Sequence, residues 1–349
     1  MERNELASLV RPNIRNLTPY STARDEYRGA LGIFLDANES PYDTGWNRYP
    51  DPHQQALKQR ISAIKGVPEA SIFAGNGSDE AIDLLFRVFC IPGRDNAIAI
   101  TPSYGMYSVA AATNDIAMRE VPLGADFSLP VEALLGAADA DSKLLFLCSP
   151  NNPTGNAFRP EDILALAARF RGIVVLDEAY IDFSRVPSLL PELARRPNLV
   201  ILQTLSKAWG LAGLRLGLAF ADPYIIRLMS MVKYPYNINA ATLKLALTAL
   251  EDSPAARVEA LLEERARLEK TLPAFACVRK VWPSEANFLL VEVDDADALY
   301  ARLLADGIIV RNRSRVRGCA GCLRITVGLK EENDRLVQSI AAYEKSLVH

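Results

Sequence analysis

Residues 204–217, which read TLSKAWGLAGLRLG, place a lysine among small and apolar residues. Lys207 is followed by small and apolar residues, and Arg215 stands eight positions further along. A lysine that is withdrawn from water has a lowered amine pKa, which makes the amine a nucleophile able to form an imine. Arg215 adds a fixed charge that can bind a phosphate, and Thr204 and Ser206 add hydroxyl donors. The segment therefore predicts a buried, reactive lysine beside an anion site, although most lysines are solvated loop residues.

A carboxylate and two tyrosines also lie at the end of an apolar run or shortly after one, as Lys207 does. Asp177 ends the apolar run GIVVLD, where a half-buried carboxylate needs a cationic partner such as a protonated ring nitrogen. Tyr180, three residues on, can present a phenol to the same ligand, and Tyr104 in TPSYGMY offers an aromatic face. Asp177 is equally compatible with a helix cap, so by itself it leaves both interpretations open.

Two turn-like segments could hold further parts of a ligand. Asn152 lies in NNPTG, a turn sequence that can also hold an asparagine rigidly toward a ligand oxygen. In GNGSDEAIDLLF, Ser78 suits a helix N-cap and Asp79 the first helical turn. The free amides of such a helix start can bind an anion. Ordinary capping explains this second segment equally well.

The elements that must position these residues alternate along the chain. Apolar runs that read as strands are separated by amphipathic helical patterns such as DEAIDLLFRVF and EDILALAARF. This alternation predicts an α/β fold with a mostly parallel sheet covered by helices on both faces. Ligands of such sheets bind beyond the carboxyl ends of the strands, and the polar segments above each follow a strand directly. The strands are expected at NAIAI, KLLFLC, GIVVLD, LVILQT and LGLAF.

The pattern changes after the middle of the chain. A long charged helical stretch precedes the strand patterns NFLLVEV, GIIVRN and CLRITVG, with a helix ADALYARLLAD between the first two. We therefore expect an N-terminal arm at residues 1–30, a large α/β domain at 31–245 and a smaller α+β domain at 246–349.

Composition excludes several classes of function. The net charge of −3 over 349 residues argues against a nucleic-acid-binding protein. No apolar run is long enough to cross a bilayer, and the N-terminus lacks the apolar core of a signal peptide. Five cysteines suit a reducing cytoplasm, and the single C-x-x-C at Cys319 and Cys322 lacks the second pair that a zinc site needs. A soluble cytoplasmic enzyme without a metal is expected.

An imine-forming lysine, a carboxylate for a ring nitrogen, a stacking tyrosine and a phosphate cradle together describe a site for pyridoxal 5′-phosphate. The motifs SPNNPTG, DEAY and TLSKAWGLAGLRLG resemble those of the fold-type I aminotransferases. Within that superfamily, NLTPY, DANESPY, RYPDP, SYGMYSV and GCLRITVG are most similar to the histidinol-phosphate aminotransferase family. The resemblance extends over nearly the whole chain.

The resemblance implies a role for each cofactor residue. Lys207 would carry the cofactor and move the proton between the substrate Cα and the cofactor. Asp177 would pair with the ring nitrogen, Asn152 and Tyr180 would hydrogen-bond the ring oxygen, and Tyr104 would stack on the ring. The phosphate would be held by Ser78, Asp79, Thr204, Ser206 and Arg215, and by Tyr49 from the neighbouring subunit of a homodimer.

The resemblance also implies the substrates: L-histidinol phosphate and 2-oxoglutarate would give imidazole acetol phosphate and L-glutamate, a step of histidine biosynthesis. Arg324, in LRITVG, would bind either the substrate phosphate or the glutamate carboxylate, because a guanidinium offers paired donors to both. Arg311 and Tyr20 would add phosphate contacts, although Arg311 could also be a solvated charge at a strand end. Asn38 and Asn152 complete the expected substrate contacts.

Three alternatives stay open at this point. A threonine-phosphate decarboxylase of cobalamin assembly has a similar sequence and also binds a phosphorylated amine. A broad aromatic or branched-chain aminotransferase would share the cofactor residues. A regulator that binds the cofactor would need an N-terminal DNA-binding domain, for which an arm of roughly 30 residues leaves no room.

Overall fold

Short runs rich in leucine and β-branched residues form a seven-stranded sheet in the computed structural model, which describes residues 3–20 and 32–347. The sheet has the strand order β1-β7-β6-β5-β4-β2-β3. Its strands are β1 (Ile72–Asn76), β2 (Asn96–Thr101), β3 (Ala117–Pro122), β4 (Ser142–Cys148), β5 (Ile173–Asp177), β6 (Leu199–Thr204) and β7 (Leu216–Phe220). All five strands expected in the large domain are present, and the predicted α/β fold is confirmed.

One strand runs against the expected direction. Neighbours β2, β3, β4, β5 and β6 pair in parallel, but β7 is antiparallel to both β6 and β1. The carboxyl ends of β1, β2, β4, β5 and β6 therefore meet at one edge of the sheet, and the amino end of β7 joins them there. Thr204 at the end of β6 pairs with Gly217 near the start of β7. This direction brings Arg215 to the same edge as Lys207.

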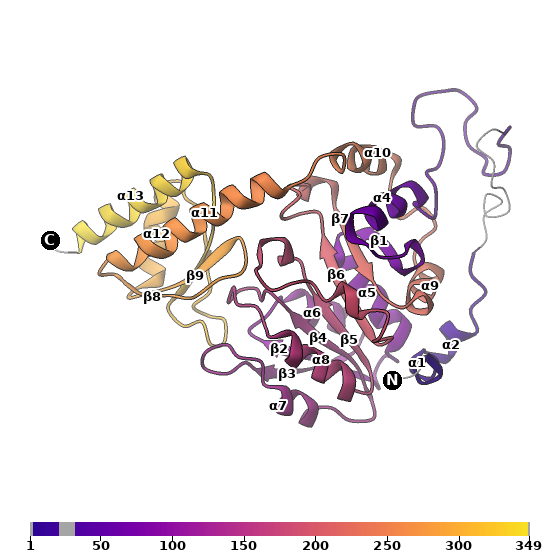
Figure 1. Cartoon of the computed structure of the whole chain (residues 1–349), viewed down its shortest axis with the longest axis horizontal. Coiled ribbons are helices and arrows are strands. Elements are labelled where there is room, and N and C mark those ends of the chain that lie inside the picture. Colours follow the sequence, from indigo (N-terminus) through magenta and orange to yellow (C-terminus); the bar gives the residue numbers. More distant parts are fainter. Residues whose placement is uncertain (1–2, 21–31, 348–349) are drawn as a thin grey trace.

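Helices cover both faces of the sheet, as the alternating side chains require (Figure 1). On one face Leu145, Leu147, Leu176 and their neighbours pack against α4 (Gln55–Lys65), α7 (Val131–Gly136), α8 (Pro160–Arg169) and α10 (Ala240–Ala249). On the other face Phe146 and Val175 pack against α1 (Arg3–Leu9), α2 (Pro12–Arg15), α5 (Ser78–Phe89), α6 (Met106–Thr113) and α9 (Pro223–Val232).

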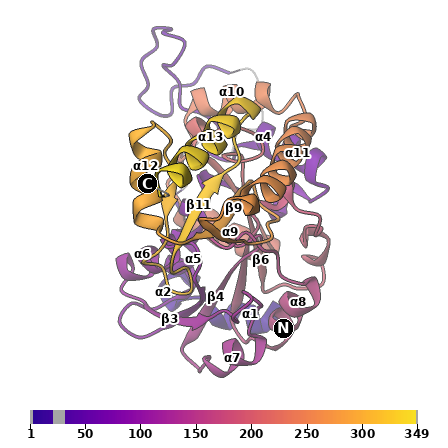
Figure 2. The same cartoon turned by 90° about the vertical axis from the view of Figure 1, so that its left-hand side faces the viewer.

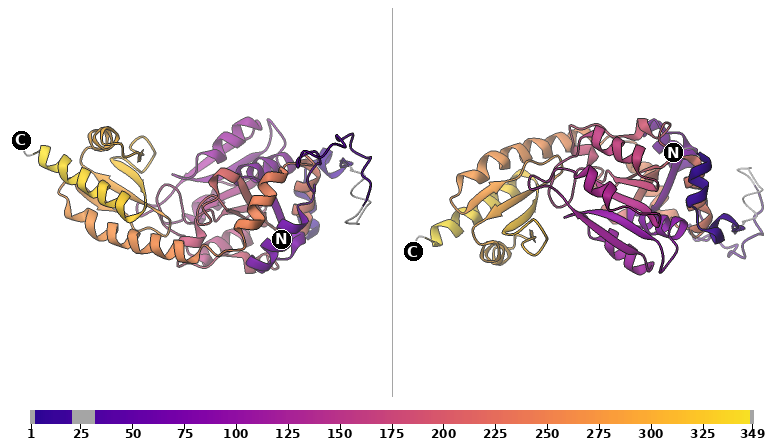
Figure 3. Two further views of the ribbon diagram at one scale, coloured as in Figure 1. Left: turned by 90° about the horizontal axis from the view of Figure 1, so that it is seen from above. Right: turned by 90° about the horizontal axis from the view of Figure 1, so that it is seen from below.

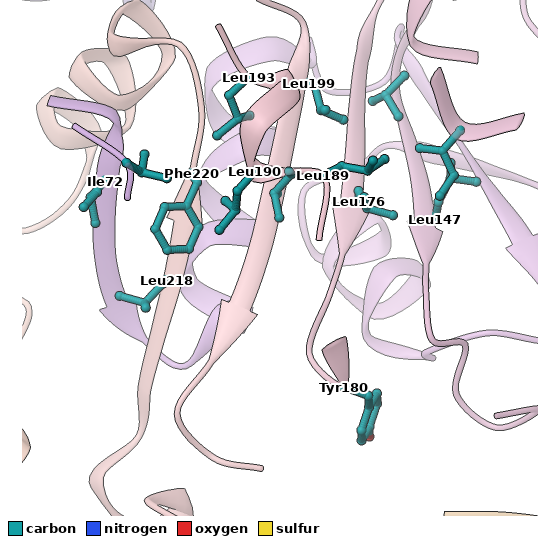
Figure 4. Packing of buried hydrophobic residues seen from close by; sticks show 14 of the residues in the cluster. Ile72, Leu147, Leu176, Tyr180, Leu189, Leu190, Leu193, Leu199, Leu218 and Phe220 are labelled. Carbon is teal, nitrogen blue, oxygen red and sulfur yellow. The ribbon is translucent and has the colours of Figure 1, made fainter. Parts of the chain in front are cut away.

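Figure 4 shows the first of these faces, with Leu147 on β4, Leu176 on β5 and Phe220 on β7. Leu189, Leu190 and Leu193, from the segment after β5, pack over them. Tyr180 belongs to the same cluster but lies beyond the strand ends. The core thus anchors the segment after β5 through its leucines, while Tyr180 at its start lies beside the strand ends, where a site can form.

The small domain is built on an antiparallel sheet with the order β10-β11-β9-β8. Its strands are β8 (Val278–Val281), β9 (Phe288–Val293), β10 (Arg311–Asn312) and β11 (Cys322–Thr326). Leu289, Leu303 and Leu336 belong to its core, which α11 (Ala255–Thr271), α12 (Ala296–Ala305) and α13 (Lys330–Ser346) help to form. Figure 2 shows these helices around β9 and β11. The strand expected at GIIVRN is reduced to the two residues of β10.

The long helix α11 runs from the large domain to the small one, and the two domains lie side by side along the long axis (Figures 1 and 3). Ala246 and Leu250 pack in the core of the large sheet, and Val258 in α11 joins them. The domain limits at 30/31 and 245/246 stay predictions, and part of the expected N-terminal arm lies outside the described residues.

Candidate active site

The carboxyl edge of the large sheet holds one pocket that collects the predicted cofactor residues. Every one of them except Tyr49 lines it: Ser78, Asp79, Tyr104, Asn152, Asp177, Tyr180, Thr204, Ser206, Lys207 and Arg215. They come from the segments that follow β1, β2, β4, β5 and β6 and precede β7. The expectation that these polar segments meet in space is therefore met in the geometry, while the individual roles remain predictions.

Lys207 is not buried, and this expectation from the sequence was wrong. Its neighbours Leu205, Ala208 and Trp209 are buried, but the Lys207 side chain is exposed and opens into the pocket. Its Nζ lies 5.5 Å from the centre of the Tyr180 ring. Partial desolvation and then the nearby charge of Arg324 lower the pKa of Lys207, while Asp177 opposes this. The amine is thus shifted toward its neutral, nucleophilic form.

Asp177 is a buried carboxylate, with only 3% of its surface exposed. The Tyr107 hydroxyl donates to its Oδ2 at 2.7 Å, and the Ala179 amide donates to its Oδ1 at 3.0 Å. Burial raises the pKa of Asp177 to about 6, and these two hydrogen bonds counteract the rise. Within residues 3–20 and 32–347, Asp177 forms no ion pair. The bond to Ala179 caps a tight turn, but it leaves the carboxylate without a cation.

The next carboxylate along the chain shows the contrast. Glu178 accepts from Ser188 Oγ at 2.6 Å, from the Leu189 amide at 2.9 Å and from Gln203 Nε2 at 2.9 Å. Glu178 is also buried, but it does not line the pocket. Its lone pairs are satisfied by the protein, so Glu178 has a structural role. Asp177, by contrast, lines the pocket, where a cationic group of a ligand can still pair with it.

An anion cradle forms where α5 begins. The helix starts at Ser78 and its N-cap is Gly77, so the expectation that Ser78 is the N-cap was wrong. Gly77 has a φ of +73° and no side chain caps the helix, which leaves the first amides open to a ligand. Arg215, in the left-handed conformation, extends Nη1 to 3.4 Å from Ser206 Oγ.

Close backbone approach holds this cradle together. The Gly77 amide donates to the Arg215 carbonyl at 2.7 Å, and the Ser206 amide donates to Thr204 Oγ1 at 3.1 Å. A Cβ on Gly217 would lie 2.0 Å from the Ser78 nitrogen, so only glycine fits where β7 passes the start of α5. The cradle combines helix amides, two hydroxyls and a guanidinium, which are the groups that bind phosphate.

Two aromatic rings flank the pocket. The Tyr104 hydroxyl donates to Asp79 Oδ1 at 3.1 Å, which fixes its ring at the pocket edge. The Tyr180 ring is largely buried and packs edge-on against Phe288 of β9, with ring centres 5.1 Å apart. Phe288 belongs to the small domain, so this contact ties the two domains together beside Lys207.

The small domain supplies the opposite wall. Arg324 Nη1 donates to Asn152 Oδ1, a contact between β11 and the turn after β4. Arg311 is paired with Arg324 in the β10–β11 register. Both arginines line a wider cleft of about 640 Å³, together with Lys207, Asn152 and Tyr180. The predicted substrate arginines thus face the predicted cofactor lysine.

Three predicted residues lie elsewhere in the single chain. Tyr49 and Asn38 line a separate hollow, where the Tyr49 ring stacks on Tyr236 at 4.4 Å. Tyr20 is 77% exposed and lines neither the pocket nor the cleft. Because Tyr49 was predicted to act in a neighbouring subunit, one chain does not test it, and the roles of Tyr20 and Asn38 also stay predictions.

The sequence reasoning missed two residues of the site. Tyr107, which holds Asp177, reads as an ordinary apolar position of a helix, and only its spacing of three residues from Tyr104 pointed to the site. Arg313 also lines the cleft, but it belongs to none of the motifs that were used to predict the site. Its alternation with Arg311 along a strand was the available signal.

Cys319 and Cys322 line neither the pocket nor the cleft, whereas Cys148, at the end of β4, lines the pocket. Cys319 and Cys322 are free and buried, in a small cluster with Phe127 and Leu290. In the described part of the chain no group of His, Cys, Asp or Glu could hold a metal ion. Across the same residues, no helix is long and apolar enough to span a membrane.

Comparisons with known proteins identify the family. Residues 35–340 match the family described as aminotransferase class I and II. A histidinol-phosphate aminotransferase of Parabacteroides distasonis is 54% identical over 96% of this chain and 98% of its own length. One from Bacteroides fragilis is 52% identical over 97% of this chain and 99% of its own length.

Solved structures show the same fold. Histidinol-phosphate aminotransferase from Sinorhizobium meliloti, in complex with pyridoxal-5′-phosphate, has a TM-score of 0.79 and 25% identity over 86% of this chain and 83% of that one. An L-threonine-O-3-phosphate decarboxylase from Porphyromonas gingivalis has a TM-score of 0.71 and 23% identity over 85% of this chain and 91% of that one, and shares the fold alone. The identity of the relatives over their full length, together with the site, decides the family. The chain belongs to the class I and II aminotransferases and, within them, to the histidinol-phosphate aminotransferase family.

Proposed function

We propose that the protein transfers the amino group of L-histidinol phosphate to 2-oxoglutarate, with pyridoxal 5′-phosphate as its cofactor. The observation that carries the proposal is one pocket that joins Lys207, Asp177 and the start of α5. The adjoining cleft shares Lys207 with this pocket and is lined by Arg324. Relatives that share about half of the sequence over nearly the whole chain have this activity as their name.

The residues fit the cofactor. Asp177 is a buried carboxylate that makes no ion pair in the described chain, which suits a protonated ring nitrogen. The open amides of α5, with Ser206 and Arg215, suit its phosphate. When bound, the cofactor supplies a carbonyl that accepts the amino group and a protonated ring that withdraws electrons from the substrate Cα.

The chain's own residues then divide the remaining work. Lys207 Nζ, with its lowered pKa, holds the cofactor and afterwards takes the proton from the substrate Cα. Asp177 keeps the ring nitrogen protonated, and Tyr180 and Asn152 orient the ring through its oxygen. Arg324 fixes the anionic end of the substrate, and Asn152 in turn holds Arg324 in place.

The first experiment is a single turnover. Cofactor-loaded protein is mixed with L-histidinol phosphate in the absence of any keto acid, and the visible absorbance of the lysine-bound cofactor is followed. We expect loss of that band and stoichiometric formation of the aminated cofactor. An unchanged band would reject this substrate, and release of carbon dioxide from threonine phosphate would then support the decarboxylase, since histidinol phosphate has no carboxylate to lose.

We also propose that two copies form a homodimer with shared active sites. Ile33, Leu35 and Tyr42 are at least 80% exposed, and Trp46 is 61% exposed in the same stretch of chain. Contiguous apolar exposure of this kind is typical of an interface with another protein chain. Tyr49 lies in this stretch, where a second copy would bring it to the neighbouring cofactor phosphate.

Complementation tests the shared site. Lys207→Ala and Tyr49→Ala chains are purified separately, mixed under mild dissociating conditions and reassociated. If Tyr49 acts across the interface, the mixture recovers activity that neither variant has, because hybrid dimers contain one intact site. Sedimentation of the unmutated protein as a monomer would reject the proposal. The cytoplasmic location remains a prediction.

A further inference from the structure

The substrate wall carries a third arginine that neither the motifs nor the proposed roles include. Arg311 and Arg324 are direct partners in the β10–β11 pairing, and the Arg313 amide continues the ladder by donating to the Cys322 carbonyl at 2.8 Å. Because side chains alternate along a strand, Arg311 and Arg313 lie on the same face. Asn312 between them turns the other way and donates to Asp297 of α12 at 2.6 Å. All three arginines line the cleft that contains Lys207.

The positive charge of these three side chains is not neutralised within the part of the chain that the structure describes. Among residues 3–20 and 32–347, Arg311, Arg313 and Arg324 form no ion pair with a carboxylate. Arg324 donates to the neutral Asn152, and its guanidinium lies 5.4 Å from the centre of the Phe288 ring. The Nε of Arg313 is buried without a hydrogen-bond partner. Glu120 lines the same cleft, but the contact it makes is with the Ser108 hydroxyl at 3.2 Å.

The arginines are close enough to influence one another. Burial and then the charge of Arg313 lower the pKa of Arg324, and burial and then the charge of Arg311 lower the pKa of Arg313. A cluster of like charges that lacks counter-charges is destabilising by itself, and an anion that enters the cleft relieves the repulsion. The cleft is therefore built for a ligand with more than one negative charge.

The two amino donors, L-histidinol phosphate and L-glutamate, would present different anionic groups to these arginines. A phosphate monoester carries a charge of about −1.5 to −2 at neutral pH and three acceptor oxygens. A carboxylate carries one charge and two oxygens, which a single guanidinium fork can satisfy. Arg324 can thus serve both substrates, whereas a third guanidinium adds donors and charge that only the phosphate uses fully.

We propose that Arg313 is a specificity-determining residue, which binds the substrate phosphate and favours a phosphorylated amine over glutamate. This inference rests on the proposed function, since it assigns selectivity between the two substrates of that reaction. It predicts that the loss of Arg313 affects one half-reaction much more than the other.

The chain offers a matched control two residues away. Arg315 has the same charge and belongs to the same loop, but it is exposed and does not line the cleft. Arg313→Gln and Arg315→Gln therefore change the net charge equally, and only the first removes a guanidinium from the cleft. Arg313→Lys retains the charge and removes the planar fork.

The experiment measures kcat/KM for L-histidinol phosphate and for L-glutamate in separate half-reactions. For Arg313→Gln we expect a loss of about 30-fold with the phosphate substrate, mostly through KM, and less than about threefold with glutamate, as for one charge-assisted hydrogen-bond donor. Arg313→Lys falls between the parent and Arg313→Gln, and Arg315→Gln leaves both values unchanged. Equal losses on both substrates, or no loss, would overturn the proposal.

A binding measurement separates this inference from the proposed function. Inorganic phosphate is titrated calorimetrically into cofactor-loaded parent, Arg313→Gln and Arg315→Gln proteins, in which the cofactor already fills the α5 cradle. We expect binding about tenfold weaker in Arg313→Gln alone. If the parent fails to react with histidinol phosphate but still shows this difference, the proposed function fails and the anion site stands. If phosphate binds all three proteins equally, the role of Arg313 is wrong.

Discussion

The two walls of the active site are built in opposite ways. The cofactor wall lies on the ends of strands buried in the sheet, and most of its polar groups already have partners within the protein: Asp177 has two donors, Tyr104 is bonded to Asp79, and Arg215 lies near both Ser206 and Asp79. The substrate wall rests on β11, which carries Arg324, and on the two-residue strand β10 with its continuation, which carry Arg311 and Arg313. These arginines have no counter-charge in the described chain.

The difference follows from how long each ligand stays. A cofactor that remains bound allows a preorganised pocket, whose groups are held in place by hydrogen bonds within the protein. A substrate anion enters and leaves in every cycle, so the arginines that bind it must be tolerated by the fold when no anion is present. Partly exposed guanidinium groups can do so, because water solvates them between turnovers.

The largest expected effect tests the cofactor wall. Lys207→Ala removes both the attachment point of the cofactor and the base that moves the Cα proton. We expect turnover to fall by ~10⁴-fold or more, and the visible band of the lysine-bound cofactor to be absent. Stopped-flow absorbance measures both. A variant that keeps that band would show that another group carries the cofactor.

The substrate wall is tested by Arg324→Gln. Both amino donors depend on this guanidinium, so we expect kcat/KM to fall by roughly 10²- to 10³-fold for histidinol phosphate and for glutamate alike. Cofactor affinity, measured by equilibrium dialysis, stays within about twofold of the parent, since Arg324 does not line the cofactor pocket. Loss of the cofactor together with the substrates would show that the two walls are not independent.

The buried carboxylate predicts a pH dependence of stability in the cofactor-free protein. The pKa of Asp177 lies at about 6 in the fold, above the ordinary value of 3.8, so the folded state holds a proton that the unfolded chain has lost. This contribution is fully present below about pH 4 and is lost as the pH rises through 6. The difference amounts to at most about 3 kcal/mol.

Urea unfolding of the cofactor-free parent and of Asp177→Asn between pH 4.5 and 7.5 measures this contribution. We expect the stability of the parent, relative to the variant, to fall as the pH rises. Cofactor binding should remove the trend in the parent, because the ring nitrogen supplies the missing cation. A parallel pH dependence in both proteins would contradict the assignment of Asp177.

The smallest expected effect is that of Tyr107→Phe, which tests whether this tyrosine tunes Asp177 in the cofactor wall. Tyr107→Phe removes the donor to Asp177 Oδ2 but keeps the ring, which stacks on Phe146 at 4.8 Å. One lost hydrogen bond to a carboxylate predicts a decrease in kcat of about tenfold, together with a shift in the pH titration of the visible band. Tyr343→Phe, which removes a phenol from the core of the small domain, serves as the control. No spectral shift in Tyr107→Phe would mean that this tyrosine only fills space.

Much of the site was accessible from the sequence because of one geometric rule. Polar residues that directly follow apolar strands meet at one edge when the strands are parallel, so Asn152, Asp177 and Lys207 could be grouped without coordinates. The strands β1, β3 and β8 were not anticipated, because each is short or interrupted by polar residues. Their absence from the prediction did not disturb the grouping.

What the sequence determined by itself was the set of reactive residue types and their positions at strand ends, because these follow from local periodicity and composition. Only the tertiary structure decided how they face one another. The antiparallel direction of β7 brings Arg215 to the cradle, and the exposed position of Lys207 reflects the pocket in front of it. The burial of Tyr107 against Asp177, and of the Nε of Arg313 in the cleft, depends on contacts between segments far apart in the chain. Such contacts are set by strand pairing and domain packing, which leave no local pattern to read.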